Sequence, residues 1–476
     1  MVQSTACPAS GQIESVRDRL KQRQGLPFLE FLSPDLVETA CRHCRHLWRE
    51  RIYTPSITLA IFLSQVLSDD HSCDDAVDRF QKYRFDRGLP RVSTSTGSYC
   101  EARQRLPEIL IWDLVRRVGR SIHQEANQGW LFHGRSVKIA DGSTVIMPDT
   151  PRNQATYPQA KTQAPGVGFP IARILVVFSL AVGTVLEAAL GPYQGKETSE
   201  LALLRQVVAV FQPGDIFLAD RFFCSYWAIA ALQGRGVDVV VRLHQRRRAD
   251  FRRGRWLGPE DRLVTWMKPE QRPAWMSRAE YEAMPAELTV RILRVRVQDK
   301  TKRVRKLEIV TTLRDAVKYR KKEVGILFRQ RWHAELDLRT LKSQMQMEML
   351  RAKSPEMVGK EVAMHLLAYN LIRGIMAEAA RVAEVKPRQL SFTGAQHTVR
   401  AFESVHLYDP ARIAADFPRL LELIGEKRVG DRPDRYEPRA VKRRPKPHPL
   451  LQMPRKAARR LIKRGIILYD KKKYKT

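Results

Sequence analysis

The stretch IARILVVFSLAVGTVLEAALG, residues 171–191, decides the fold class of this chain. Two runs rich in aliphatic and β-branched residues flank a turn centred on Gly183, which predicts two strands joined as a hairpin. Only the 13 residues from Ile174 to Leu186 are free of charge, whereas a helix needs about 20 apolar residues to cross a bilayer. We therefore expect buried strands of a soluble protein and no membrane partner.

The segments around this hairpin predict a mixed α/β core. SVKIADGSTVIMPD predicts a strand that passes Asp141 into a turn at Gly142. A helical pattern covers residues 197–211, and DIFLADRFF then predicts a short buried strand that ends at Asp220. A helix to about Gly234 and the strand VDVVVRL follow. An Asp at a strand end is a common place for a functional group in such folds, although it is often only a turn residue.

Residues 244–315 interrupt this core, and LTVRILRVRV within them alternates apolar residues with Arg, which predicts a β-rich, basic insertion. Helix is expected to resume near Val317 and to continue past Met349, and Ser354-Pro355 predicts the start of the next helix. The last stretch, residues 431–476, holds 17 Lys+Arg against 4 Asp+Glu. The chain is therefore expected to end in a basic tail.

The N-terminal part, residues 1–130, predicts helices. Thr54 followed by Pro55 is typical of an N-cap and first helical residue before the apolar run ITLAIFLSQVL. Ser98 and Glu101 have the spacing of a capping box. These signals indicate a small helical domain ahead of the α/β core.

The charge of the whole chain points to a polyanionic partner. There are 84 Lys+Arg against 51 Asp+Glu, a formal net charge of +33, and nucleic acid is the first candidate for such a surface. The predicted helix Tyr99–Leu106 exposes Arg103 and Arg105, residue types that contact phosphates and base edges. A helical DNA-binding domain and an ordinary solvated helix both fit this stretch.

The six cysteines are scattered, which does not resemble a secreted disulfide framework and indicates a reducing compartment. Cys41 and Cys44 form a CxxC, with His and Cys residues nearby, so a zinc site is one interpretation. The run CRHCRHLWRE also has the periodicity of an amphipathic helix, which favours ordinary helix residues.

The segment FRQRWHAELDLRTLK, residues 328–342, concentrates the chemistry. Phe328, Arg331, Glu335 and Lys342 are spaced so that they fall within roughly 60° of one another on a helix. One stripe then carries a ring, a guanidinium, a carboxylate and an ammonium. A surface helix with a salt bridge at i, i+4 would show the same spacing.

This segment resembles the Tyr-x2-Arg-x3-Glu-x6-Lys signature of insertion-sequence transposases of the insertion-sequence-four group, with Phe328 in the Tyr position. ADGSTV at Asp141, LADRFF at Asp220, and RWHAE and TLKSQ around the Glu are also similar to that group, from about Asp141 through Asn370. The resemblance implies a DDE transposase with an RNase H-like core, an enzyme that recognises terminal inverted repeats, cleaves DNA strands and joins the freed 3′ end to target DNA.

In that family, the residues that match Asp141, Asp220 and Glu335 would hold two divalent ions, Mg²⁺ with Mn²⁺ able to substitute. One ion would lower the pKa of the attacking water or 3′-hydroxyl, and the other would stabilise the leaving oxygen. Arg331 and Lys342 would bind phosphates near the cleaved end. Phe328 lacks the hydroxyl that contacts a phosphate in the family, so the resemblance preserves only the packing of its ring.

The resemblance also implies double-stranded DNA as partner, a homodimer on paired transposon ends, and the bacterial cytoplasm, in association with the nucleoid, as location. Some relatives hold a flipped base with a Trp of the β insertion; Trp256, Trp266 and Trp275 lie there, and none can be aligned to that role. A related nuclease without strand transfer and a catalytically idle DNA-binding relative are the alternatives.

The expected organisation follows from these boundaries. It comprises a helical DNA-binding domain (1–130), the RNase H-like core in two parts (131–243 and 316–375) around the insertion (244–315), C-terminal helices (376–430) and the basic tail (431–476).

Overall fold

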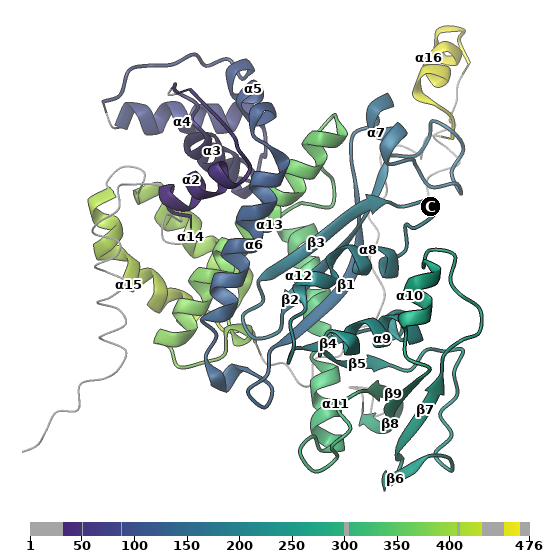
Figure 1. The fold of residues 1–476 in the computed structure, drawn as a ribbon. Coiled ribbons are helices and arrows are strands. Elements are labelled where there is room, and N and C mark those ends of the chain that lie inside the picture. The colour runs from purple at the N-terminus through teal and green to yellow at the C-terminus, as the bar shows by residue number, and fades with distance from the viewer. Residues whose placement is uncertain are drawn as a thin grey trace, which may run out of the picture.

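The structure is a computed structural model that describes residues 32–49, 51–86, 88–298, 304–406, 410–430 and 452–466. A mixed sheet runs through the molecule, with helices on both faces and a helical bundle beside it (Figure 1). This architecture confirms the predicted α/β class with an RNase H-like core and helical flanking regions. Most of the basic tail, residues 431–451 and 467–476, lies outside the described residues.

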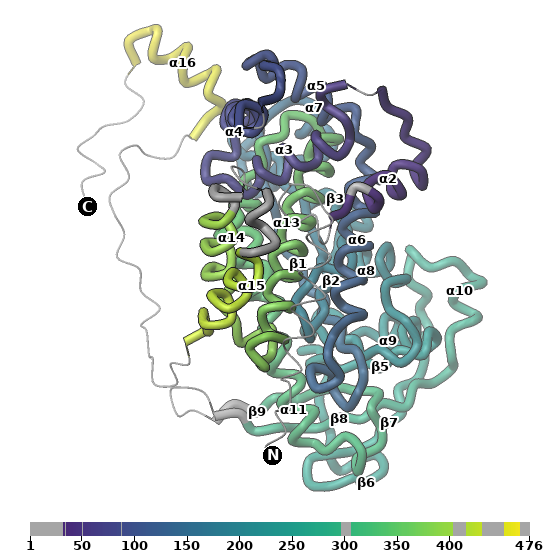
Figure 2. Tube along the Cα trace, turned by 90° about the vertical axis from the view of Figure 1, so that its left-hand side faces the viewer, coloured from purple at the N-terminus to yellow at the C-terminus, as the bar shows by residue number. Residues whose placement is uncertain are grey.

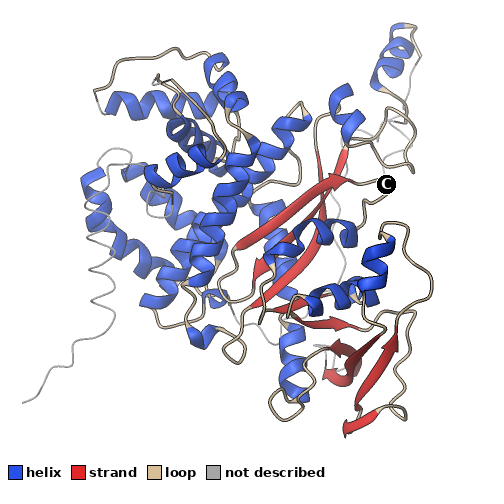
Figure 3. Cartoon of the chain, viewed as in Figure 1, coloured by secondary structure: helices blue, strands red, loops and turns tan. Residues whose placement is uncertain are grey.

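Within the described ranges, nine strands form one sheet. They are β1 (Val137–Ile146), β2 (Ile171–Ser179), β3 (Val185–Pro192), β4 (Ile216–Ala219), β5 (Asp238–Arg242), β6 (Arg255–Gly258), β7 (Asp261–Met267), β8 (Glu287–Gln298) and β9 (Val304–Thr311). Their order across the sheet is β3-β2-β1-β4-β5-β9-β8-β7-β6. β4 is parallel to both β1 and β5, and every other neighbouring pair is antiparallel. The strands of the insertion, β6 to β9, therefore extend the core sheet beyond β5 (Figure 3).

The α-helices of the described residues lie on the two faces of this sheet and in the helical part beside it (Figure 1). They are α2 (Pro34–His43), α3 (Pro55–Leu67), α4 (Cys73–Asp86), α5 (Gly97–Arg105), α6 (Glu108–Gln124), α7 (Pro151–Thr156), α8 (Glu200–Val207), α9 (Tyr226–Gly234), α10 (Arg278–Ala283), α11 (Lys321–Arg329), α12 (Trp332–Arg339), α13 (Pro355–Val382), α14 (Phe392–His406), α15 (Pro410–Glu426) and α16 (Arg455–Lys463). α8 and α9 cover one face of the sheet, and α6 and α13 cover the other. α13 lies between α6 and the pair α14 and α15, at the centre of the helical part (Figure 2).

The predicted hairpin forms as β2 and β3, with Gly183 in the turn at φ +85°. Along β2, Ile174 and Val176 pack toward α6 and α13, whereas Leu175 and Val177 pack toward α8 and α9. All four are fully buried. A strand covered on both faces needs apolar residues at successive positions, which explains the continuous apolar run.

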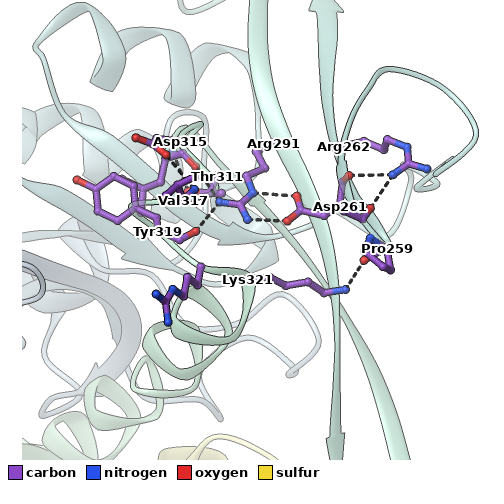
Figure 4. A network of polar contacts seen from close by, with 12 residues as sticks. Pro259, Asp261, Arg262, Arg291, Thr311, Asp315, Val317, Tyr319 and Lys321 are labelled. Carbon is purple, nitrogen blue, oxygen red and sulfur yellow. Dashed lines mark hydrogen bonds and ion pairs between the residues drawn. The ribbon is translucent and has the colours of Figure 1, made fainter.

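A buried ion pair fastens the insertion to the chain that returns to the core (Figure 4). Arg291 of β8 is 0% exposed, and its guanidinium donates to both carboxylate oxygens of Asp261 at 2.8 and 2.6 Å. The same guanidinium donates to the carbonyl oxygens of Leu313 and Tyr319, just before α11. The start of α11 is therefore tied to the insertion, so the two are expected to move as one unit.

The helix signals of the N-terminal part are only partly confirmed. Thr54 caps α3 and Pro55 is its first residue, as predicted. The capping box of Ser98 and Glu101 is wrong, because α5 already begins at Gly97 and its N-cap makes no side-chain hydrogen bond.

The predicted helix over CRHCRHLWRE is correct only as far as His43. Cys44 ends α2 by donating its backbone N–H to Ala40, and Arg45 then adopts φ 54°, a conformation that cannot continue a helix. In the described part of the chain, no helix is long and apolar enough to cross a membrane.

Candidate active site

The register of two parallel strands brings Asp141 and Asp220 to the same edge. β1 and β4 pair in parallel up to Ile139 and Leu218, and each Asp lies two residues beyond that last pair. Neighbouring strands are about 4.8 Å apart, and positions two residues apart share a face. The two carboxylates are therefore equivalent in register and lie on the same side of the sheet.

The surroundings of Asp141 differ from the sequence prediction in one respect. The predicted turn at Gly142 is wrong, because β1 continues to Ile146 and pairs with β2 along its whole length. Asp141 therefore lies inside β1, at the point where its other neighbour β4 has ended. The side chain of Asp141 is 20% exposed at this point.

Burial raises the pKa of the Asp141 carboxyl from its ordinary value of 3.8 to about 6. The backbone N–H of Gly142 donates to Asp141 Oδ1 at 2.9 Å and lowers this pKa, as does the nearby Arg331, whereas the carboxylates of Glu200 and Glu335 raise it. Several acidic groups thus lie within electrostatic range of one buried carboxylate.

Helix α12 packs against β1 and brings the third predicted carboxylate to the site. Arg331 Nη2 donates to Glu335 Oε1 at 2.5 Å, and Arg331 Nη1 lies 4.0 Å from Asp141 Oδ2. The side chains of Arg331 and Asp141 are 17% and 20% exposed, while that of Glu335 is 36% exposed. The guanidinium therefore interacts with both carboxylates and partly neutralises them.

The prediction of one continuous helix past Met349 is wrong. The chain tightens where Arg331 N–H donates to Phe328 O, three residues back, and widens into a π-helical turn over Thr340–Gln344 after α12. Beyond this turn the chain straightens, and Met349 forms a β-bridge with Ile146 at the end of β1. The four motif residues therefore do not form one regular stripe, although Arg331 and Glu335 stay in contact.

The other two residues of this motif have separate surroundings. Phe328 is 6% exposed, and its ring packs in the hydrophobic core. Lys342 lies in the π-helical turn, and its Nζ pairs with Glu348 Oε1 at 3.1 Å.

Glu200 is a carboxylate at the site that the sequence reasoning missed. It lies in the first turn of α8, after the N-cap Ser199. A Cβ atom at Gly142 would be only 2.4 Å from Glu200 Cδ, so the carboxylate packs directly on the backbone of β1. Burial raises the pKa of Glu200; Arg173, at 3.5 Å, lowers it, and Asp220 raises it. An isolated Gly inside a strand often marks such a close approach, and this was the available signal.

Of the two arginines predicted to contact DNA from α5, only Arg105 faces solvent. Arg103 Nη1 donates to Gln65 Oε1 at 3.1 Å, and Arg103 Nη2 lies 3.1 Å from Cys73 Sγ. This guanidinium is committed to the interior of the helical domain, which corrects its expected role in binding DNA. Arg105 has a 61% exposed side chain and a 3.5 Å pair with Glu101, so it stays available.

The tryptophans of the insertion also differ in exposure. Trp266 is 8% exposed with the Arg247 guanidinium 4.0 Å from its ring centroid, and Trp275 has Arg205 at 3.9 Å. Trp256, on β6, is 64% exposed. Trp256 is thus the most accessible ring of the three.

The donor set fits a hard divalent cation by its chemistry, because every candidate ligand is a carboxylate oxygen. The burial and mutual repulsion that raise the pKa of Asp141 are conditions that a bound cation would relieve. Among the described residues, however, no three His, Cys, Asp or Glu side chains converge closely enough to hold a metal ion. Arg331 lies beside two of the predicted ligands instead.

A family model described as the transposase DDE domain matches residues 132–371, about half of the chain, so the protein belongs to the DDE transposase family. The transposase InsG for insertion sequence element IS4 of Escherichia coli (strain K12) is 28% identical to it over 375 residues. That alignment covers 77% of this chain and 81% of the relative. The predicted membership of the insertion-sequence-four group is thereby confirmed.

Proposed function

We propose that this insertion-sequence transposase binds the terminal inverted repeats of its element, cleaves the DNA strands in a metal-dependent reaction and joins the freed 3′ end to target DNA. The observation that carries the proposal is the register equivalence of Asp141 and Asp220 on β1 and β4, with Glu335 approaching from α12. The family match supports a polynucleotidyl transferase as the type of enzyme.

In this proposal Asp141, Asp220 and Glu335 are the ligands of two divalent ions, Mg²⁺ with Mn²⁺ able to substitute. Such ions, when bound, activate an attacking hydroxyl and stabilise the leaving oxygen of a phosphodiester. Asp141, with its pKa of about 6, is mostly ionised at neutral pH and so can act as a ligand. Arg331 offers a bidentate fork to a phosphate and Lys342 a point charge.

The partners in this proposal are the two transposon ends and the target duplex, bound by a homodimer in the bacterial cytoplasm. The net charge of +33 supports a polyanionic partner. Cutting both ends in concert requires two active sites, which is the reason for a dimer.

The test incubates the purified full-length protein with the DNA that flanks its own gene, in Mg²⁺ or in EDTA, and maps nicks and joined products at nucleotide resolution. The matched variants are Glu335→Gln and Glu356→Gln, since Glu356 is an exposed carboxylate on α13. Mg²⁺-dependent nicks at the element ends that Glu335→Gln abolishes and Glu356→Gln retains, followed by strand joining, are expected.

Nicks without joining would identify a nuclease instead. Binding without cleavage in Mg²⁺ or Mn²⁺ would identify an idle DNA-binding relative. Either result would overturn the proposal.

A further inference from the structure

Two cysteines from different helices of the helical part share one guanidinium. Cys73 is the first residue of α4, and Cys100 lies in the first turn of α5. Arg103, further along α5, places its Nη2 atom 3.1 Å from Cys73 Sγ and 3.8 Å from Cys100 Sγ. The side chains of Cys73 and Cys100 also hydrogen-bond each other. These two cysteines, the α4–α5 thiol pair, therefore form one cluster with a positive charge beside both sulfurs.

Several features of this cluster favour a thiolate, which is the reactive form of cysteine. Burial is the largest influence and raises the pKa of Cys73, whereas Arg103 lowers this pKa. Gln65 lowers it as well, and its Nε2 donates to Cys73 Sγ at 3.7 Å. Both thiols lie in the first turn of a helix, where the helix dipole favours negative charge. Both are free and half-buried, so a small oxidant can reach them.

A second pair of cysteines in the helical part has the opposite surroundings. Cys41 is fully buried in α2, and Cys44 Sγ donates to the carbonyl oxygen of Cys41 at 3.4 Å. Burial, together with Cys44 and the carboxylate of Glu38, raises the pKa of Cys41 to about 11. The neighbours of this α2 thiol pair thus act against a thiolate, whereas Arg103 counteracts the effect of burial on Cys73. The chain therefore contains its own comparison for the reactivity of the α4–α5 thiol pair.

We propose that Cys73 and Cys100 form a reversible disulfide on exposure to hydrogen peroxide, an inference that does not rest on the proposed function. A thiolate of the pair attacks the peroxide, so that an S–O bond forms, the O–O bond breaks, and the hydroxide that leaves takes up the thiol proton. The second thiol then attacks the sulfenic sulfur, so that the S–S bond forms, the S–O bond breaks and water leaves. The two sulfurs are oxidised by two electrons in total, and the peroxide is reduced to two water molecules.

The disulfide joins the start of α4 to α5 and closes residues 73–100 into a loop. Such a closure restricts the unfolded chain and opposes local opening of the elements inside the loop. Helix α5 is already held by the long helix α13, because Lys360 Nζ donates to the carbonyl oxygen of Gln104 at 2.8 Å. Oxidation is therefore expected to fasten α4 to an anchored helix and to slow hydrogen exchange in α4.

The test treats the reduced full-length protein with hydrogen peroxide, alkylates the remaining thiols at a series of times and maps tryptic peptides without reductant. The α4–α5 thiol pair is divided between two peptides, residues 52–79 and 92–103, so its disulfide joins them with the loss of two hydrogen atoms. We expect this joined peptide to form at least about tenfold faster than any product of the α2 thiol pair, because only thiolates react. Dithiothreitol should reverse it.

Three variants test the parts of the cluster. Cys73→Ser should leave Cys100 as a sulfenic acid that dimedone traps, because the second thiol is missing. Arg103→Gln should slow formation of the disulfide about three- to tenfold, since a charge-assisted contact to the thiolate is lost. Arg105→Gln removes an exposed guanidinium of the same helix and should match the wild type.

Two results from the wild type alone would overturn the proposal, whatever the variants do to folding. One is oxidation of the α4–α5 thiol pair no faster than that of the α2 thiol pair. The other is a disulfide that joins either member of the pair to a different cysteine. An unchanged rate in a folded Arg103→Gln variant would overturn the role of the guanidinium.

Discussion

Replacing Asp141 by Asn is expected to stabilise the metal-free protein, and to do so more strongly as the pH rises. Burial raises the pKa of this carboxyl from 3.8 to about 6, so the folded state holds the proton more tightly than the unfolded state does. The folded protein therefore loses stability as the pH rises from about 4 through 6, because a buried charge must form. Asn stays neutral and avoids this cost.

The size of the effect follows from the same two pKa values. The difference in unfolding free energy between Asp141→Asn and the wild type should be about 1–2 kcal/mol at pH 5 and about 3 kcal/mol at pH 8. Asn can still accept the Gly142 N–H, which donates at 2.9 Å in the wild type. The attraction of the Arg331 guanidinium, 4.0 Å from Asp141, already lowers the pKa to about 6 and is therefore contained in these figures.

The assay is urea unfolding followed by circular dichroism at pH 5, 6, 7 and 8 in EDTA, for the wild type, Asp141→Asn and Asp149→Asn, an exposed control. Addition of Mg²⁺ should then raise the midpoint of the wild type and leave that of Asp141→Asn unchanged, since a ligand stabilises only the state that binds it. If the difference in unfolding free energy between Asp141→Asn and the wild type does not grow between pH 5 and pH 8, burial does not raise the pKa of Asp141. A variant less stable than the wild type at pH 8 would refute the reasoning altogether.

Four further substitutions test other parts of the structure. Asp220→Asn and Glu335→Gln should each abolish Mg²⁺-dependent nicking while end binding, measured by anisotropy, persists; nicking by either variant would remove that residue from the proposed metal site. Lys342→Ala should weaken end binding and lower the salt slope by about 0.9, and an unchanged slope would exclude a phosphate contact. Asp261→Asn should cost about 3–5 kcal/mol in urea unfolding, because it leaves the fully buried Arg291 without its counter-ion; a loss below 1 kcal/mol, on the order of a surface pair, would contradict that assignment.

Strands could be predicted from the sequence where their burial produces a local pattern of apolar residues. The hairpin in residues 171–191 was correct because strands covered on both faces need unbroken apolar runs, and such runs can be read directly. The prediction of a turn at Gly142 was wrong because glycine occurs both in turns and at places where another side chain packs closely on the backbone. Here glycine makes room for Glu200 from another element, and that requirement is invisible in a local window.

The shape of the motif segment could not be predicted for a similar reason. Nothing in the residues around Thr340–Gln344 marks a π-helical turn, since the segment contains neither Pro nor Gly. The change of path follows from long-range contacts, namely the bridge of Met349 to Ile146 and the buried Asp337, whose carboxylate accepts hydrogen bonds from Arg388. Spacing along an ideal helix thus identified the candidate residues but not their mutual positions.

Arg331 joins the electrostatics of the site to its proposed chemistry. Its guanidinium hydrogen-bonds Glu335 and lies 4.0 Å from Asp141, so one positive charge partly offsets two carboxylates. Divalent ions bring more charge to the same oxygens and would release the guanidinium, which is then free to hold a phosphate of the bound DNA. Under the proposed function, bound metal frees Arg331 for a DNA phosphate, and bound DNA draws Arg331 away from the carboxylates that hold the metal. The affinities for metal and for DNA should therefore be positively linked.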